Sequence, residues 1–296
     1  MSAIIECTHL QRKFMSGTPV LEDVNLTVEQ GSVVGLVGRN GTGKSTLIKT
    51  LLGLLRPQGG EVRVFGLDPF KEPVAVRSRI GYVAEKLVFP AGAKVGDIFE
   101  IHRGIYRNWD YAYELELVAR FGIDRGAKFG TLSKGQAQQA SLICAIAHRP
   151  ELLLLDEPAG GLDPAARKAF IDVYIDLMSK GDVTILLSSH DMLDVERICN
   201  EIAILHKGEI LVKDDLAALR EGLTLAIVPN SEAAGFRQLA SGLPAFPGRE
   251  RNSDVQYVLR APIDECRAVL DELNGNVALS SLSLGDLFIE LTGGAI

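Results

Sequence analysis

The alternation of apolar and polar residues along the chain predicts a series of strands and helices. Residues 4–30 alternate in the way of half-buried strands, whereas the apolar runs at 33–37, 151–155 and 183–189 are typical of fully buried strands. Segments with helical spacing follow these runs, for example residues 46–52 and 137–147. This order favours an α/β fold with buried parallel strands.

Two parts of the chain depart from this pattern. Helical periodicity and a cluster of aromatic residues begin near residue 90 and predict an inserted helical subdomain over about 90–147. Beyond residue 220, three strands at 224–229, 255–260 and 276–280 alternate with helices, and a final helix is predicted over 283–293. We therefore predict a main domain over 1–220 and a small α+β accessory domain over 221–296, with a packing, dimerisation or regulatory role.

Composition and charge narrow the class of protein. The 296 residues are 47% hydrophobic and 23% charged, an ordinary globular balance, and the net charge of −7 argues against a nucleic-acid surface. No apolar run has membrane-spanning length, and the N-terminus does not have the pattern of a signal peptide. The four cysteines are widely scattered, so we expect reduced thiols in a cytosolic protein.

A glycine-rich turn lies between the predicted strand at 33–37 and the helix that follows. It matches G-x-x-x-x-G-K-[ST], whose glycines let successive backbone N–H groups point at one phosphate. Lys44 adds a mobile positive charge, and the Ser45 hydroxyl suits Mg²⁺. A chance match is the alternative, which the strand before and the helix after disfavour. We expect nucleotide binding by Gly38, Asn40, Gly41, Thr42, Gly43, Lys44, Ser45 and Thr46.

Two adjacent acids end the buried strand at 151–156, because Pro158 stops it. Neighbouring side chains of a strand point to opposite faces, which suggests separate tasks for Asp156 and Glu157. One would orient Mg²⁺ and the other would polarise the attacking water; two solvated turn residues are the alternative. His190 emerges where the next strand ends and is either structural or a phosphate sensor.

Three other features allow a structural and a functional interpretation. Phe14 fills a core or stacks on adenine. Ser133 and Gln136 form a capping box, which explains the helix start but not the exposed Lys134-Gly135 between them. Asp163 precedes Pro164 at the start of a helix, so capping explains it as well as function does.

Together these segments resemble the ATP-binding subunits of ABC transporters over residues 1 to about 220. Residues 38–46 match the Walker A loop, 132–136 the signature, and 152–156 the Walker B strand. The resemblance then makes Glu157 the catalytic glutamate, His190 the switch histidine and Phe14 the adenine-stacking aromatic, and it puts Asp163 in the D-loop. The signature is the segment that separates this family from other P-loop NTPases.

The resemblance implies a fold, cofactors and partners. The fold is a P-loop NTPase of ABC ATPase type with an antiparallel β subdomain, a helical insert and a small C-terminal α+β appendage. The cofactors are ATP and Mg²⁺, with Ser45, Asp156 and Glu85 as metal ligands. Two copies would sandwich ATP between the Walker A loop of one and Ser133, Gly135 and Gln136 of the other. The partner would be a separate transmembrane permease, with this subunit cytoplasmic and peripheral on the inner face of the cell membrane.

Two residues depart from the family pattern. Glu85 stands where the family usually has glutamine; a carboxylate still ligates Mg²⁺ but adds negative charge near the γ-phosphate. We interpret it as a mark of the drug- and antibiotic-exporter type (ABC-2), so export is the expected direction. Lys134 stands where glycine is common and either helps to bind the facing nucleotide or points into solvent.

Two rival functions remain at this stage. The first is a soluble ABC-type ATPase that acts as a conformational switch on nucleic acid or ribosomes; its usual coiled coil or second cassette is missing from this sequence. The second is a regulatory ATP-binding module without turnover, which the presence of Asp156, Glu157 and His190 opposes.

Overall fold

The computed structural model describes residues 2–14, 17–86, 89–179, 183–239, 241, 243, 245–246, 249–251, 253–270 and 277–293. Contacts divide the chain into two compact units, Met1–Lys213 and Asp214–Ile296. The boundary predicted after residue 220 lies inside a short helix of the second unit, α8 (Leu216–Glu221).

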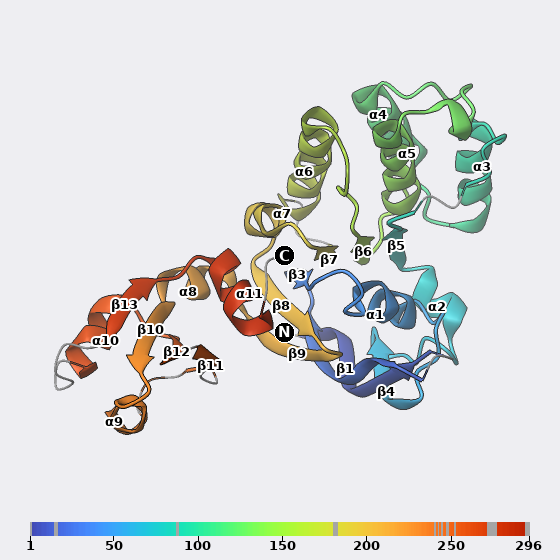
Figure 1. The fold of residues 1–296 in the computed structure, drawn as a ribbon. Helices are drawn as coiled ribbons and strands as arrows, with labels where there is room; N and C mark the ends of the chain where they lie inside the picture. The colour runs from blue at the N-terminus through green and yellow to red at the C-terminus, as the bar shows by residue number, and fades with distance from the viewer. Residues whose placement is uncertain are drawn as a thin grey trace. The chain divides into compact units, whose positions relative to one another are not determined.

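The first unit is built on a nine-stranded mixed sheet, drawn in Figure 1, with strand order β4-β1-β2-β9-β8-β3-β7-β6-β5. Its centre is parallel: β3 pairs with β7 and β8, and β6 pairs with β5 and β7. Its antiparallel edge pairs β1 with β2 and β4. The strands are β1 (Ala3–Lys13), β2 (Pro19–Glu29), β3 (Val33–Val37), β4 (Gly59–Val64), β5 (Ile80–Val83), β6 (Leu152–Asp156), β7 (Thr184–Ser189), β8 (Glu201–His206) and β9 (Glu209–Asp215).

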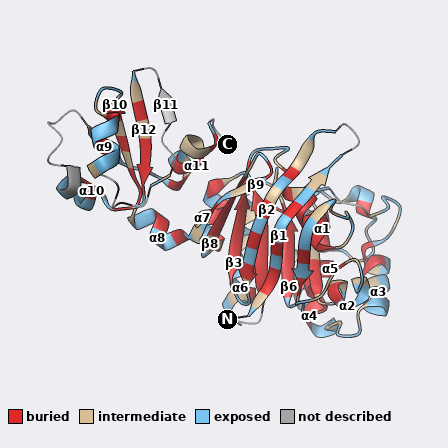
Figure 2. Cartoon of the chain, turned by 90° about the horizontal axis from the view of Figure 1, so that it is seen from below, coloured by how far each residue is buried: buried red, intermediate tan, exposed pale blue. Residues whose placement is uncertain are grey.

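The apolar runs of the sequence become the buried centre of this sheet. Every residue of β3, β6 and β7 is buried, and Figure 2 shows β3 and β6 among the red strands. Alternate residues of β6 point to opposite faces of the sheet. Leu153 and Leu155 belong to the hydrophobic cluster on one face, whereas Leu152 and Leu154 belong to the cluster on the other. A continuous apolar run is therefore required here, and the predicted α/β class with buried parallel strands is confirmed.

Helices cover this sheet and form the insert. The phosphate-loop glycines lead into α1 (Lys44–Leu51), and α2 (Pro73–Arg77) precedes β5. The insert contains α3 (Val95–Ile105), α4 (Tyr111–Phe121) and α5 (Lys134–Ile146), which lie together at the upper right of Figure 1. The remaining helices of this unit are α6 (Pro164–Ser179) and α7 (Met192–Ile198). The sequence predicts that the helix beginning at Pro164 closes at Gly181, a residue that lies outside the described ones.

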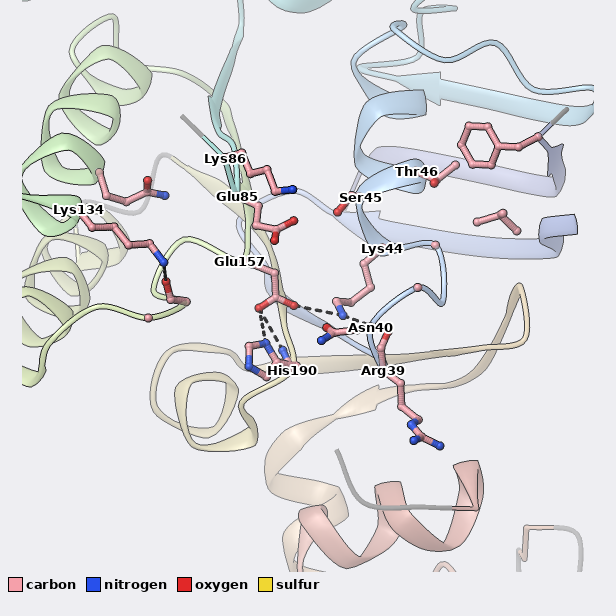
Figure 3. Close-up of a pocket in the computed structure, with 17 residues that line it drawn as sticks. Arg39, Asn40, Lys44, Ser45, Thr46, Glu85, Lys86, Lys134, Glu157 and His190 are labelled. Carbon is pink, nitrogen blue, oxygen red and sulfur yellow. Dashed lines mark hydrogen bonds and ion pairs between the residues drawn. The ribbon is translucent and has the colours of Figure 1, made fainter. Parts of the chain in front are cut away.

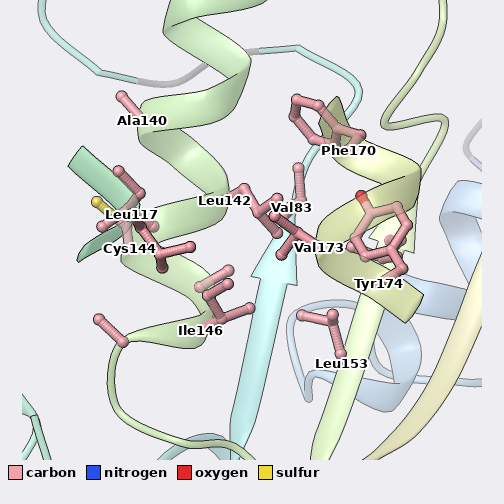
Figure 4. Close-up of a cluster of buried hydrophobic side chains, with 14 of the residues drawn as sticks. Val83, Leu117, Ala140, Leu142, Cys144, Ile146, Leu153, Phe170, Val173 and Tyr174 are labelled. Atoms are coloured by element: carbon pink, nitrogen blue, oxygen red, sulfur yellow. The ribbon is translucent and has the colours of Figure 1, made fainter. Parts of the chain in front are cut away.

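One hydrophobic cluster fastens the insert to the sheet. In Figure 4, Phe170, Val173 and Tyr174 of α6 lie across β5 and β6 from Leu142 and Ile146 of α5, and all five side chains are buried. The apolar face of α6 is therefore part of this core. Because the signature begins α5, this core supports the signature, whereas Leu47, Ile48 and Leu51 of α1 pack in the other hydrophobic cluster.

The second unit contains a four-stranded antiparallel sheet with order β11-β12-β10-β13. Its elements after α8 are β10 (Thr224–Pro229), α9 (Ala233–Leu239), β11 (Arg249–Arg251), β12 (Asp254–Leu259), α10 (Ile263–Leu270), β13 (Ala278–Ser281) and α11 (Leu284–Thr292). Strand β11 lies in a segment expected to be loop, since its sequence Arg-Glu-Arg has no apolar alternation. None of the described helices is long and apolar enough to cross a membrane.

Gly81 marks the tightest approach between the insert and the sheet, and it supports a first prediction. A Cβ atom on Gly81 would lie 2.1 Å from the Ala145 carbonyl oxygen and 2.9 Å from a Leu153 methyl group. We expect Gly81→Ala to lower the free energy of unfolding by about 1–3 kcal/mol, because backbone has to move. Urea denaturation measures this change.

A matched control is Gly104→Ala in α3, where a Cβ would meet no atom within 4 Å. Alanine favours helix there, so we expect unchanged or slightly increased stability, by less than about 1 kcal/mol. Equal unfolding midpoints for the two variants would contradict the packing described between α5 and β5.

His148 supports a second prediction, on the pH dependence of stability. Its side chain is 2% exposed, its Nε2 lies 3.1 Å from the Ile80 carbonyl oxygen, and its ring stacks on Tyr106. Burial lowers the pKa of His148 from 6.5 to about 4. Between these two values the unfolded chain binds the proton and the folded chain does not, so stability falls as the pH is lowered, by about 3 kcal/mol at most.

We expect His148→Gln to remove this component from the difference in unfolding free energy between pH 7 and pH 4.5. Glutamine retains a donor for the Ile80 carbonyl. The control is His9→Gln, since the His9 side chain is 70% exposed. An unchanged pH dependence in His148→Gln would show that another group accounts for the acid sensitivity.

Candidate active site

The phosphate loop connects β3 to α1, as predicted. The structure shows why three of its positions are occupied by glycine. Gly41 and Gly43 have φ values of +83° and +107°, which glycine adopts without the cost of a Cβ. A Cβ on Gly38 would lie 2.6 Å from the Leu205 carbonyl oxygen and equally close to the Thr42 hydroxyl. Glycine is therefore required for backbone direction at two positions and for space at the third.

Lys44, the first residue of α1, is buried beneath this loop. Its Nζ donates to the Gly38 carbonyl oxygen at 2.6 Å and lies 3.2 Å from Glu157 Oε1. A buried ammonium needs such partners, because desolvation without them is costly. The Lys44 ammonium is thus held between the backbone of the phosphate loop and the carboxylate of Glu157, which follows β6.

Asp156 ends β6 and is joined to α1 and β7 by hydroxyl groups. Ser45 Oγ donates to Asp156 Oδ1 at 2.9 Å, and Ser188 Oγ donates to the same oxygen at 2.8 Å. Burial raises the pKa of Asp156, opposed by these two hydrogen bonds. A desolvated carboxylate beside a serine hydroxyl is a pair of hard oxygen ligands that a divalent cation would stabilise.

Glu157 points away from Asp156 because the backbone changes direction between them. Its φ is +48°, in the left-handed region, and its N–H donates to Ser188 Oγ at 3.1 Å. Figure 3 shows its carboxylate between Lys44 and His190. Lys44 Nζ lies next to Oε1, and His190 Nδ1 donates to Oε2 at 2.7 Å. The carboxylates of Asp156 and Glu157 therefore face different sets of partners.

A cavity of about 910 Å³ opens above these groups. This volume suits a nucleotide-sized ligand. Figure 3 shows Glu85 and Lys86 approaching it from the segment after β5, opposite Lys44 and Arg39. It is lined by Phe14, Val20, Arg39, Asn40, Gly41, Gly43, Lys44, Ser45, Thr46, Glu85, Lys86, Lys134, Gln138, Glu157, Gly160, Gly161 and His190.

Phe14 is part of this cavity and not of a core. Its side chain is 43% exposed, and the Arg12 guanidinium lies 5.3 Å from the centre of its ring. The core-filling interpretation is wrong for this residue. An exposed ring on the cavity wall is available for stacking.

Several predicted site residues do not line the cavity. Gly38, Thr42 and Asp156 contact it indirectly, through Lys44, Arg39 and Ser45. Ser133 and Gln136 form the capping box of α5, and Asp163 Oδ1 caps α6 by accepting from the N–H groups of Ala165 and Ala166. Ser133, Gly135, Gln136 and Asp163 are thus outside the cavity of their own chain.

Ser188 was not predicted, although it contacts both acids. Its hydroxyl binds the Asp156 carboxylate and accepts from the Glu157 N–H. The available signal was a polar residue near the end of an otherwise apolar buried strand. Lys86 was also missed, and no local pattern distinguishes it from a surface lysine.

Comparison with known proteins agrees with this geometry. The model of the ABC transporter family matches residues 21–160. The ATP-binding protein YtrB of Bacillus subtilis is 35% identical over 209 residues, which cover 71% of each chain. The daunorubicin/doxorubicin resistance ATP-binding protein DrrA of Streptomyces peucetius is 30% identical over 301 residues, 95% of this chain and 90% of that protein.

Solved structures show the same fold. An ATP-binding subunit of an ABC transporter superposes with a TM-score of 0.67 at 30% identity, over 73% of this chain and 92% of that one. The dimeric cassette MJ0796 has a TM-score of 0.64 at 24% identity, over 72% of this chain and 98% of that one. The predicted ABC-type P-loop NTPase fold is confirmed. This chain belongs to the family of ABC transporter ATP-binding proteins, whose ATPase domain binds and hydrolyses ATP.

Proposed function

We propose that this chain hydrolyses Mg²⁺-bound ATP to power export through a separate membrane-spanning permease. The observation that carries the proposal is the division of labour at the end of β6. Asp156 is hydrogen-bonded to Ser45, whereas Glu157 turns to Lys44 and His190. The comparisons with known proteins give no support to the alternative, a switch on nucleic acid or ribosomes.

Nucleotide binding is assigned to the cavity around the phosphate loop. The backbone N–H groups of residues 38–46, at the start of α1, would bind the phosphates with Asn40, Thr42 and Thr46. Lys44 would exchange its partner Glu157 for phosphate oxygens. Phe14, which also lines the cavity, would stack on the base.

Magnesium would be held by Ser45 and Asp156, with Glu85 near it. Two protein oxygens and phosphate oxygens suit an ion that keeps several waters. The described residues contain no cluster of three or more His, Cys, Asp or Glu side chains suited to a metal. That finding fits an ion bound mainly by the nucleotide. When bound, the ion would neutralise phosphate charge.

Glu157 would act as the general base. It would accept a proton from water as the water oxygen bonds to the γ-phosphorus, the bond from phosphorus to the bridging oxygen breaks, and ADP and phosphate leave. His190 would hold the carboxylate and contact the γ-phosphate. With 12% of its side chain exposed, Glu157 is shielded from competing solvent.

A second copy would complete the site. Ser133, Gly135, Gln136 and Asp163 lie outside the cavity of their own chain, while the start of α5 offers backbone N–H groups to an anion. We assign these residues to the nucleotide held by the partner. Dimers of this kind would close on ATP and open after hydrolysis.

The permease is assigned to a groove between α2 and α3. Val74, Ile101 and Ile105 are 77%, 56% and 67% exposed, and a hollow of about 380 Å³ includes Val74, Arg79 and Ile105. Exposed aliphatic side chains around a groove suit a short helix of a partner. We expect the chain at the cytoplasmic face of the cell membrane. Export is inferred from the relative named for daunorubicin and doxorubicin resistance.

Loss of Lys44 tests nucleotide binding. We expect Lys44→Ala to reduce kcat/KM for ATP by about 100-fold, because the phosphates lose their buried cation. Steady-state phosphate release measures it. The control Lys71→Ala removes a lysine whose side chain is 81% exposed and should hydrolyse ATP normally. Normal hydrolysis by Lys44→Ala would refute the phosphate site.

Loss of the base tests the chemical step. We expect Glu157→Gln to bind ATP with nearly unchanged affinity, to lose about 100-fold or more in kcat, and to accumulate as an ATP-bound dimer. Rapid-quench kinetics and analytical ultracentrifugation measure these effects. Glu151→Gln, one residue before the start of β6, is the control. A normal rate for Glu157→Gln would move the base to another group.

A further inference from the structure

Lys134 joins the signature to the loop that carries the general base. It is the first residue of α5, and its Nζ donates to the carbonyl oxygen of Gly160 at 2.5 Å. Figure 3 shows the side chain extending from α5 to this contact. Neither expectation for Lys134 foresaw it, since the sequence left open only a nucleotide or solvent.

The loop over residues 157–163 is shaped to admit this side chain. A Cβ on Gly161 would lie 2.7 Å from Lys134 Nζ, and the φ of Gly161 is +69°. A Cβ on Gly135, the residue after Lys134 in α5, would lie 3.1 Å from the Ala166 methyl group. The start of α5 and the start of α6 are therefore packed against each other, with Lys134 as the polar link.

The same loop sets the direction of Glu157. The Gly160 N–H donates to the Glu157 carbonyl oxygen at 3.2 Å, and the Leu162 N–H donates to the Ala159 carbonyl oxygen at 3.2 Å. Glu157 itself has a φ of +48°, a conformation that persists only where its surroundings enforce it. A tether on Gly160 therefore acts on the backbone that aims the carboxylate at Lys44 and His190.

We propose that Lys134 is a positioning residue that couples the signature to the general base of its own chain. This inference rests on the proposed function, in which the signature touches the nucleotide held by the partner. Through Lys134, that contact is transmitted to the 157–163 loop and hence to Glu157. One nucleotide site of the dimer thereby senses the other.

Hydrogen exchange tests the tether without ATP. Lys134→Met keeps an unbranched side chain and removes the terminal donor, and Lys134→Arg keeps a charged donor. Lys168→Met is the control, because the side chain of Lys168 on α6 is 78% exposed. In the nucleotide-free full chain, we expect exchange in residues 157–163 to accelerate about fivefold in Lys134→Met alone. Equal exchange in all variants would overturn the tether, whether or not the chain hydrolyses ATP.

Kinetics then test the coupling. We expect Lys134→Met to lower kcat about fivefold with KM for ATP unchanged, and to reduce the Hill coefficient for ATP toward one. Lys134→Arg should restore kcat and the Hill coefficient. A rise in KM with unchanged kcat would make Lys134 a nucleotide ligand and overturn the inference. Unchanged kinetics in all variants would overturn it as well. Absence of hydrolysis in the unmodified chain would instead refute the proposed function.

Discussion

Two adjacent carboxylates must serve different partners, and the site depends on how the backbone separates them. Asp156 is still part of β6, so it is buried and hydrogen-bonded to Ser45 and Ser188. Glu157 adopts a left-handed φ, which turns its carboxylate to Lys44 and His190. Burial raises the pKa of Asp156, so the ion pairs and hydroxyl contacts around both groups offset a real desolvation cost.

The sheet brings these groups to one edge. In the parallel register, Val37 lies opposite Ser189 and Asp156 lies opposite Ser188, so β3, β6 and β7 end level with one another. The phosphate loop, Glu157 and His190 each follow one of these ends, and Asp156 is the last residue of β6. Ligands of open parallel sheets bind at this edge, which explains why residues more than a hundred positions apart form one cavity.

Local patterns were enough for much of this site. Glycine spacing predicted the phosphate loop, Pro158 predicted the end of β6, and Ser133 with Gln136 predicted the start of α5. Contacts between distant segments left no local pattern in the sequence. The hydrogen bond from Lys134 to Gly160 depends on how the helical insert packs against the loop after β6. The contacts of Ser188 with both acids depend on the pairing of β7 with β6. Strand β11 was missed because its charged residues pair without apolar alternation.

The most direct test of the central claim is to identify what the chain binds in its own cell. The tagged protein would be purified from gently solubilised membranes, with mass spectrometry of whatever accompanies it in stoichiometric amount. The account predicts a multi-span membrane protein whose addition raises the ATPase rate. Recovery only from the soluble fraction, alone or with ribosomes or nucleic acid, would contradict it.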